Sequence, residues 1–252
     1  YGETTVNYNR DVEIFPVLNA MFERIYGESP YKSPTDMGVN MAGFCIVDDA
    51  ACRRASEQEI IRRYYQSLCS LRQGLSEQEE VFKLELLMNQ IGLKPESRAV
   101  VPAALARAEE TGAPAVAMEL PNGKLVTGKT SPLLGASSAC LLNALKCLGG
   151  IPEDVLLISP NIIEPIQHLK VEHMGNHNPR LHTDEVLIAL SICAVTDPNA
   201  ERAMEQLAAL AGGEVHSTVI LSRVDENVFQ HLRMNLTCEP KYQTKKLYHG
   251  KK

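Results

Sequence analysis

Apolar residues recur every three or four positions along the first part of the chain, a spacing typical of amphipathic helices. One such stripe predicts a helix from about residue 11 to 26 and consists of Val12, Phe15, Leu18, Phe22 and Ile25. Further helices are expected over residues 50–71, 76–91 and 95–110, the second of them opened by a capping box at Ser76–Glu79. A short apolar run at residues 43–47 predicts a strand. Residues 1–110 are therefore expected to form a mostly helical region.

The pattern changes at Thr111–Pro114, after which short apolar runs alternate with helical stretches. Strands are predicted over residues 116–119, 124–127, 155–158, 215–221 and 235–238. Helices are predicted over residues 135–148, 159–171, 183–195 and 198–210, and after the capping box at Ser222–Asp225. Alternating strands and helices indicate an α/β region over residues 111–240, layered α/β/α with a small mixed sheet, followed by a polar basic tail at 241–252.

Charge and cysteine content narrow the class of protein. The formal net charge is -6, and the basic residues form no stripe, which argues against nucleic acid and anionic membranes as partners. No apolar run has the length of a membrane span, and no signal-peptide pattern opens the chain. The seven cysteines are odd in number, lack a C-x-x-C pair and lie among apolar neighbours. We expect them to be reduced, in a cytoplasmic α/β protein.

Gly123–Thr130 spells the phosphate-loop motif G-x-x-x-x-G-K-[ST]. That chemistry needs a strand before the first glycine and a helix starting at the lysine. Here Asn122–Gly123 is a hairpin-turn signal, and the residues after it have strand character. We therefore predict a hairpin turn and a strand at this position and no nucleotide loop.

The segment after this hairpin is the leading candidate for a binding site. Free N–H groups and the helix dipole make the start of the helix near Gly135 receptive to anions, with Lys129 as the nearby cation. The candidate anion- or substrate-binding residues are Lys129, Thr130, Ser131, Ser137 and Ser138. A plain capping role for the serines and the threonine remains the alternative.

Two polar segments are weaker candidates for contact with a substrate. The first surrounds residues 43–47 and contains Thr35, Asp36 and Asn40, which could equally serve turn formation. The second is the loop with His177 and His182, which could equally be a surface loop. His173 and His177 have metal-ligand spacing, but Gly175 and Pro179 interrupt any helix there, so we expect no metal. The residues assign no cofactor and no catalytic group.

Four segments resemble a bacterial family of unknown function, DUF 1846, also catalogued as UPF 0371. They are Thr4–Asp11, Ser33–Asn40, His216–Leu221 and Asn235–Pro240, and the resemblance extends over essentially the whole chain. It implies proteins about twice this length, of which the chain is expected to be the second half. It also implies that the N-terminal half, which carries a Gly-rich phosphate-loop-like segment, is a partner of this chain.

The function that these observations favour is that of an enzyme or binding protein for a small anionic or phosphorylated metabolite, with nucleotides among the candidates. The alternative is a non-catalytic module for docking or homo-oligomerisation, which amphipathic helices would also suit. An enzyme should show a polar cleft where the loops at Thr35, Lys129 and His177 converge, whereas a docking module should expose an apolar patch of several hundred Å².

Overall fold

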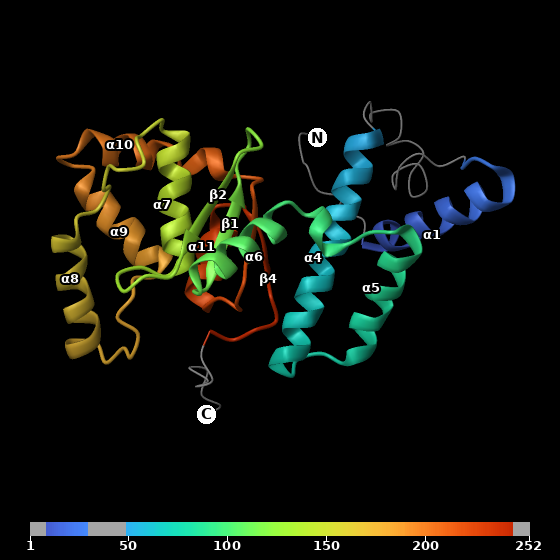
Figure 1. Cartoon of the computed structure of the whole chain (residues 1–252), viewed down its shortest axis with the longest axis horizontal. Coiled ribbons are helices and arrows are strands. Elements are labelled where there is room, and N and C mark those ends of the chain that lie inside the picture. The colour runs from blue at the N-terminus through green and yellow to red at the C-terminus, as the bar shows by residue number, and fades with distance from the viewer. Residues whose placement is uncertain (1–8, 30–48, 244–252) are drawn as a thin grey trace. The chain divides into compact units, whose positions relative to one another are not determined.

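The computed structural model describes residues 9–29 and 49–243. The chain divides into two compact units, Tyr1–Arg98 and Ala99–Lys252 (Figure 1). The change in composition at Thr111 lies one helix later than this division. The strand expected at 43–47 falls outside the described residues, as do Thr35, Asp36 and Asn40.

The described part of the first unit is helical, as its sequence pattern predicts. It contains α1 (Asn9–Tyr26), α4 (Asp49–Gln73) and α5 (Gln78–Ile91), and a 3-10 turn at Pro95–Ser97 follows. The three helices pack against one another through buried apolar side chains, among them Phe15, Ile60, Ile61, Val81 and Met88. The capping box expected at Ser76 is wrong, because α5 is capped at Glu77 without a side-chain hydrogen bond.

The second unit is built on a four-stranded mixed sheet. Its strands are β1 (Ala115–Glu119), β2 (Leu125–Lys129), β3 (Glu214–Ser217) and β4 (Asn235–Cys238), in the order β2-β1-β3-β4. β1 is antiparallel to both β2 and β3, and β3 is parallel to β4. The expected mixed sheet is therefore confirmed, and β2, β3 and β4 all run in the same direction.

Helices cover both faces of this sheet. Ala117 of β1 packs in a buried cluster with Val100 and Ala104 of α6 (Val100–Thr111). The neighbouring Val116 pairs with Gly128 of β2, and a Cβ on Gly128 would lie 2.2 Å from the backbone nitrogen of Cys140 in α7 (Ala136–Leu148). Because successive residues of a strand face opposite sides, α6 and α7 lie on opposite faces of the sheet.

The hairpin predicted at Gly123–Thr130 is confirmed. In this hairpin Ala115 of β1 lies opposite Lys129 of β2, and Glu119 lies opposite Leu125. Gly123 is in the turn and has a φ of 77°. Gly128 belongs to β2 and allows α7 to approach the strand closely, so it does not line a phosphate loop. β2 also continues to Lys129, two residues beyond the predicted end.

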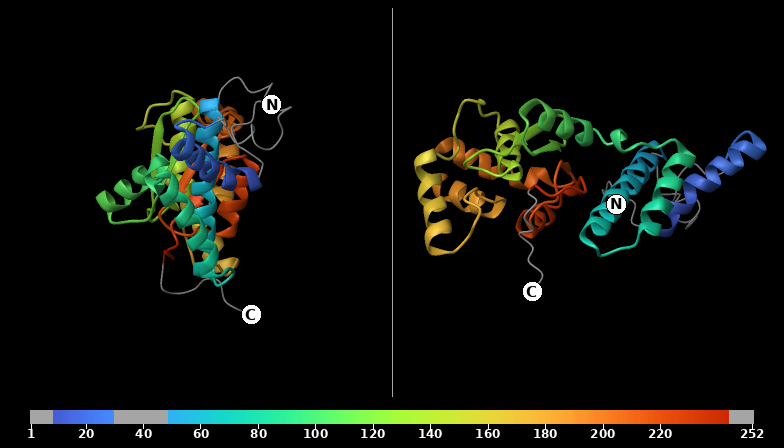
Figure 2. Two further views of the ribbon diagram at one scale, coloured as in Figure 1. Left: turned by 90° about the vertical axis from the view of Figure 1, so that its right-hand side faces the viewer. Right: turned by 60° about the horizontal axis from the view of Figure 1, so that its bottom comes forward.

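The remaining helices complete the unit around α7. They are α8 (Pro160–His168), α9 (Thr183–Cys193), α10 (Pro198–Glu205) and α11 (Arg223–His231). A π-helical turn at Leu169–His173 extends α8, and a 3-10 turn at Leu207–Leu210 follows α10. α9 packs against α7, α10 and α11, and Figures 1 and 2 show α8 and α9 side by side.

Two strand predictions in this unit need correction. Residues 155–158 form a loop, in which Leu157 and Ile158 are buried without pairing to a strand. Their hydrophobicity reflects burial in the core and not sheet pairing. β3 ends at Ser217 and not at Leu221, because the Thr218 hydroxyl bonds both backbone groups of Ala115 at the start of β1.

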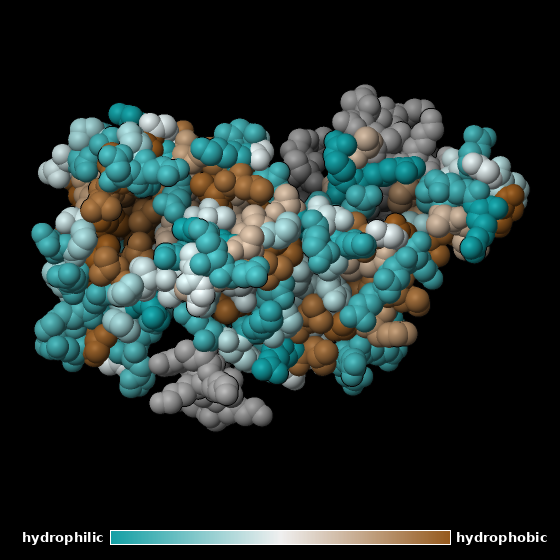
Figure 3. Space-filling model, viewed as in Figure 1, coloured by the Kyte–Doolittle hydropathy of each residue, from teal (hydrophilic) through white to brown (hydrophobic). Residues whose placement is uncertain are grey.

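The surface of the second unit carries an apolar face on α9. Ile188, Ile192 and Val195 on and just after this helix are 62%, 63% and 81% exposed. Figure 3 shows apolar side chains gathered in this region of the unit. Across the described ranges, none of the helices combines the length and hydrophobicity that crossing a bilayer requires.

The described cysteines are free thiols, namely Cys69, Cys140, Cys147, Cys193 and Cys238. None of these five takes part in a disulfide, and their reduced state stays a prediction. Burial raises the pKa of Cys140 far above that of an ordinary thiol, which makes it an inert packing residue. Cys45 and the side chain of Cys52 lie outside the described part of the chain.

Candidate functional site

The carboxyl ends of β2, β3 and β4 lie at one edge of the sheet because these strands share a direction. The chain after β2 leads into α7, and the chain after β3 leads into α11. The loop before α9 is joined to the loop before α7 by the bridge between Leu134 and Leu181. Three helices thus begin near this edge, the position at which open α/β sheets bind ligands.

A cavity of about 490 Å³ lies at this edge. Its walls come from four segments: the start of α7, the loop before α9, the loop between β3 and α11, and the residues after β4. The polar groups that line it include Thr130, Ser137, His177, Arg180, His182, Ser222 and Asp225. The volume lies in the range of small-molecule sites, about 300–1,000 Å³.

His182 and Asp225 form a hydrogen-bonded pair in the wall of the cavity. Nδ1 of His182 lies 3.0 Å from Oδ2 of Asp225. The same carboxylate accepts hydrogen bonds from Ser222 Oγ at 2.8 Å and from the backbone nitrogen and hydroxyl of Thr183, both at 3.0 Å. These bonds fix the orientation of the imidazole through Nδ1 and leave Nε2 as the nitrogen available to a ligand.

The pair shifts the pKa values of both members. The hydrogen bond to Asp225 raises the pKa of His182 above that of a free imidazole, against the opposing effect of partial burial. Burial alone would raise the pKa of Asp225, but the hydrogen bonds and charge of His182, with the bonds from Thr183 and Ser222, lower it overall. The pair is therefore an ionised carboxylate beside an imidazole that holds its proton more firmly than usual.

The start of α7 supplies hydrogen-bond donors to the same cavity. Gly135 is the N-cap residue, no side chain caps the helix, and its first turn carries no acidic residue. The first N–H groups of a helix have no acceptor within the helix, so those near Ala136 and Ser137 are available. Arg180 brings a positive charge, and its Nε donates to the backbone oxygen of Ser131 at 2.8 Å. This contact anchors the guanidinium and leaves its terminal nitrogens for a ligand.

The structure brings four of the candidate residues together at the cavity: Thr130, Ser137, His177 and His182. Lys129, Ser131 and Ser138 do not line it. Lys129 is exposed in β2, opposite Ala115. Ser138 donates to the backbone oxygen of Leu181 at 2.9 Å, and the Ser131 hydroxyl accepts from the N–H groups of residues 133 and 134. Both serines thus have local structural partners.

Sequence reasoning missed Arg180 and Asp225 as members of the site. Arg180 ends the histidine-containing loop, and its charge was the available signal. Asp225 reads in the sequence as an acid in the first turn of a helix, a role that it also has in α11. Its contact with His182 depends on tertiary packing between α9 and α11, for which the sequence carries no local signal.

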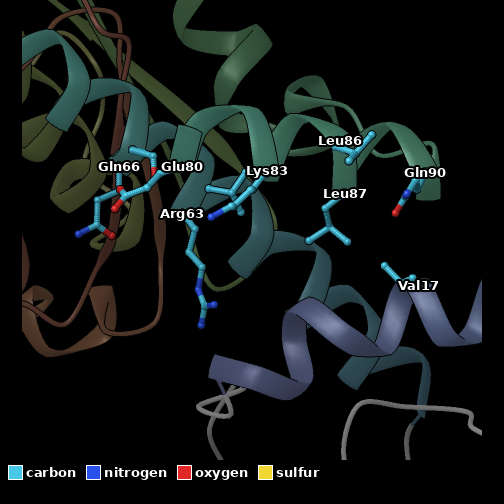
Figure 4. Close-up of a pocket in the computed structure, with 10 residues that line it drawn as sticks. Val17, Arg63, Gln66, Glu80, Lys83, Leu86, Leu87 and Gln90 are labelled. Atoms are coloured by element: carbon cyan, nitrogen blue, oxygen red, sulfur yellow. The ribbon is translucent and has the colours of Figure 1, made fainter. Parts of the chain in front are cut away.

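A second cavity, of about 460 Å³, lies in the first unit among α1, α4 and α5. Val17 of α1 and Leu87 of α5 line it and face one another (Figure 4). Both basic residues in its lining have partners: Arg63 pairs with Glu59, and Lys83 pairs with Glu79. Among the described residues that line it there is no histidine, cysteine or aspartate, so the cavity in the second unit is the stronger candidate for chemistry.

Comparison with known proteins gives family matches over nearly the whole chain. Residues 96–248 match the C-terminal domain of unknown function DUF1846, and residues 1–92 match the N-terminal domain of the same family. A UPF0371 protein of Streptococcus thermophilus (strain CNRZ 1066) is 57% identical over 248 residues, covering 98% of this chain and 50% of the relative. A UPF0371 protein of Streptococcus pneumoniae (strain JJA) is 56% identical over the same length.

The expected correspondence to the family's second half is wrong, although the expected family is right. The first 92 residues match the N-terminal family domain, so the chain includes parts of both. It spans about half the length of the curated relatives that it matches.

Proposed function

The chain belongs to the DUF1846 family, and from the cavity at the carboxyl edge of its sheet we propose that it binds a small anionic metabolite and acts on it by acid–base chemistry. Phosphorylated compounds, nucleotides among them, are the proposed class of ligand. The proposal concerns the part of the family's proteins that this chain represents.

Binding of an anion is supported by the donors that converge on the cavity. The uncapped start of α7 offers backbone N–H groups and the positive end of a helix dipole. Arg180 adds a guanidinium, whose planar donor array matches phosphate and carboxylate oxygens. The carboxylate of Asp225 is the opposing charge, but its bonds to His182, Thr183 and Ser222 occupy it.

Acid–base chemistry is supported by the His182–Asp225 pair. A carboxylate bonded to Nδ1 holds the imidazole in one tautomer and stabilises its protonated form, which leaves Nε2 to exchange a proton with a ligand. Because Ser222 Oγ bonds Asp225 and lies 3.3 Å from Nδ1, it supports the pair and does not take the position of a nucleophile on Nε2. A Ser-His-Asp hydrolase triad is therefore not the proposed mechanism.

The single observation that carries the proposal is that anion donors and this pair share one cavity. Phosphate held at the start of α7 would place the rest of a metabolite against Arg180 and His182, which line the same space. Binding and chemistry would then use adjacent groups, as a small-molecule site requires.

The matched pair Arg180→Gln and Lys129→Gln tests the binding half of the proposal. Each removes one positive charge, but only Arg180 lines the cavity. We expect Arg180→Gln to weaken phosphate or nucleotide binding by roughly ten- to a hundredfold, since a charge-assisted contact contributes about 1.5–3 kcal/mol. Lys129→Gln should change the affinity less than about twofold, as for an exposed charge. Calorimetric titration gives both values, and equal affinities in the two variants would contradict the site.

His182→Gln tests the chemical half. We expect the variant to retain phosphate affinity within a few-fold and to lose turnover of whichever phosphorylated metabolite the wild type converts in a library screen. Turnover that survives in His182→Gln would remove the acid–base role while leaving the binding site standing.

The second candidate function is docking through the apolar face of α9. It is favoured by the exposure of Ile188, Ile192 and Val195. The rest of the family's longer proteins, or a second copy of the chain, would be the partner. Sedimentation of wild type and Ile188→Asp/Ile192→Asp discriminates the two functions, since a dimer dispersed by these changes would support docking without touching the cavity.

A further inference from the structure

Three metal-ligating side chains meet at the end of α8, in a group separate from the cavity lining. His168, Glu172 and His173 are exposed, and each can present one ligand atom within 4.8 Å of the other two. Nε2 of His168 already lies 3.1 Å from Oε2 of Glu172. The rings of His168 and His173 have centroids 5.9 Å apart.

The π-helical turn Leu169–His173 brings the second histidine into this group. In a regular α-helix, residues five apart lie about 140° apart around the axis, so His173 would point away from His168. A π-turn is wider, with hydrogen bonds between residues five apart, so it brings residues at this spacing closer to the same side of the helix. The hydrogen bond from the Met174 nitrogen to the Leu169 oxygen, 3.1 Å long, has this spacing of five residues.

The turn is anchored by a side chain that points inward. Lys170 is 2% exposed, and its Nζ donates to the backbone oxygen of Arg180 at 2.8 Å and to Oε2 of Glu185 at 2.6 Å. These contacts tie the turn to the start of α9. Because Lys170 is held inward, the neighbouring Glu172 and His173 remain on the outer surface with His168.

Two imidazoles and one carboxylate are a ligand set that binds Zn²⁺ through three protein groups and leaves further positions to water. Bonds of about 2.0–2.2 Å in tetrahedral geometry require ligand atoms roughly 3.3–3.6 Å apart. The three ligand atoms lie within 4.8 Å of one another on exposed side chains, whose χ angles are free to adjust toward that range. We propose that His168, Glu172 and His173 form a zinc-binding site on the π-turn.

The proposal departs from the expectation of no metal, which considered His173 with His177 and left His168 out. A plain ion pair between the exposed side chains of His168 and Glu172 is the alternative interpretation. Such a pair needs no contribution from His173, so the His173→Ala variant separates the two. The proposal does not depend on the anion site or on its chemistry.

The test is calorimetric titration of ZnCl₂ into chelator-stripped protein of the full chain. We expect one zinc ion per chain and a loss of affinity of at least about tenfold in each of His168→Ala, Glu172→Gln and His173→Ala, since even outer-sphere changes cost about 10–100-fold. His231→Ala is the matched control, because His231 is also exposed near the end of a helix and bonds Asn227 through Nδ1. Its affinity for zinc should equal that of the wild type.

Two further readouts keep the result specific. Zinc should perturb the imidazole NMR signals of His168 and His173 and leave that of His231 unchanged, while circular dichroism confirms that the variants remain folded. Zinc affinity that is unaltered in all three ligand variants, or lost on alkylation of the partly exposed Cys69 and Cys147 instead, would overturn the proposed site.

Discussion

Asp225 accepts a hydrogen bond from His182 across 43 residues of sequence, with 3.0 Å between Oδ2 and Nδ1. His182 immediately precedes α9, and Asp225 lies in the first turn of α11, so the contact also joins the starts of two helices. One carboxylate thereby serves as a helix-terminal acid, as an acceptor for Thr183 and as the partner that orients an imidazole in the cavity. The most direct predictions concern this pair.

Asp225→Asn should lower the pKa of His182. The hydrogen bond and charge of Asp225 are the main reasons that this pKa lies above that of an ordinary imidazole. The asparagine keeps the shape of the side chain and removes the charge, so the pKa should return toward that of an ordinary imidazole. Titration of the His182 ring by NMR measures this pKa, with Asp197→Asn, at the N-cap of α10, as the control. An unchanged pKa would mean that Asp225 does not control the imidazole.

The same pair should make stability depend on pH in a defined window. The pKa of Asp225 is lowered on folding, so its stabilising contribution is present above about 3.8 and is lost as the pH falls through the folded value. The pKa of His182 is raised, so its contribution is complete below 6.5 and is lost as the pH rises through the folded value. Both contributions are complete between about pH 4 and 6.5, the window between the unshifted pKa values of the two groups. In this window the free energy of unfolding of the wild type should exceed that of Asp225→Asn by the largest amount. Urea denaturation across pH 4–9 checks this, and a constant difference would contradict it.

Local signals in the sequence located much of this architecture. The Asn122–Gly123 turn and the capping serine at position 222 both act within four residues, and the structure has the hairpin and the serine cap as expected. The predictions failed where tertiary packing decides. Leu157 and Ile158 are apolar because they fill the core from a loop, which hydrophobicity alone does not distinguish from a strand.

In the candidate site, too, local sequence signals succeeded and contacts made by tertiary packing were missed. Sequence spacing placed a cluster of polar residues before the helix that became α7, but it assigned the positive charge to Lys129, which is close in sequence. In the structure the cation at the cavity is Arg180, which is joined to the Ser131 backbone across 49 residues. The bridge between Leu134 and Leu181 and the hydrogen bond from Ser138 to the Leu181 oxygen also hold these loops together, and the periodicity of the sequence does not predict such long-range contacts.

Gly128→Ala should destabilise the second unit strongly. The added Cβ would lie 2.2 Å from the Cys140 nitrogen and 2.8 Å from the Ala136 oxygen, both of them backbone atoms of α7. Overpacking usually costs about 1–3 kcal/mol, and backbone atoms that cannot rotate aside place this change at or above the upper end. Gly135→Ala is the matched control, because its Cβ would meet only the Leu181 oxygen at 3.6 Å. Thermal or urea denaturation of both variants measures the difference, and equal stabilities would mean that β2 and α7 are less closely packed than described.

Lys170→Met should destabilise the loop that carries Arg180 and His182. Lys170 Nζ donates to the Arg180 oxygen and to Glu185 Oε2, and the other contact of Glu185 Oε2 is the His182 backbone nitrogen at 2.8 Å. Methionine fills a similar volume but leaves the Arg180 oxygen without this donor, which costs about 1–3 kcal/mol for a buried group.

Two comparisons isolate that cost. Lys146→Met is the control. Lys146 also donates to two backbone oxygens, those of Glu153 and Val155, but among the described residues it has no carboxylate partner, and it does not line the cavity. We expect this control to lose stability without altering hydrogen exchange at residues 180–182, whereas Lys170→Met should speed exchange there and weaken phosphate binding, because the loop presents Arg180 to the cavity. A double-mutant cycle with Glu185→Gln then measures the coupling between the lysine and the carboxylate. A coupling of zero, with unaltered exchange at residues 180–182, would mean that the buried lysine only fills space and does not hold the site in place.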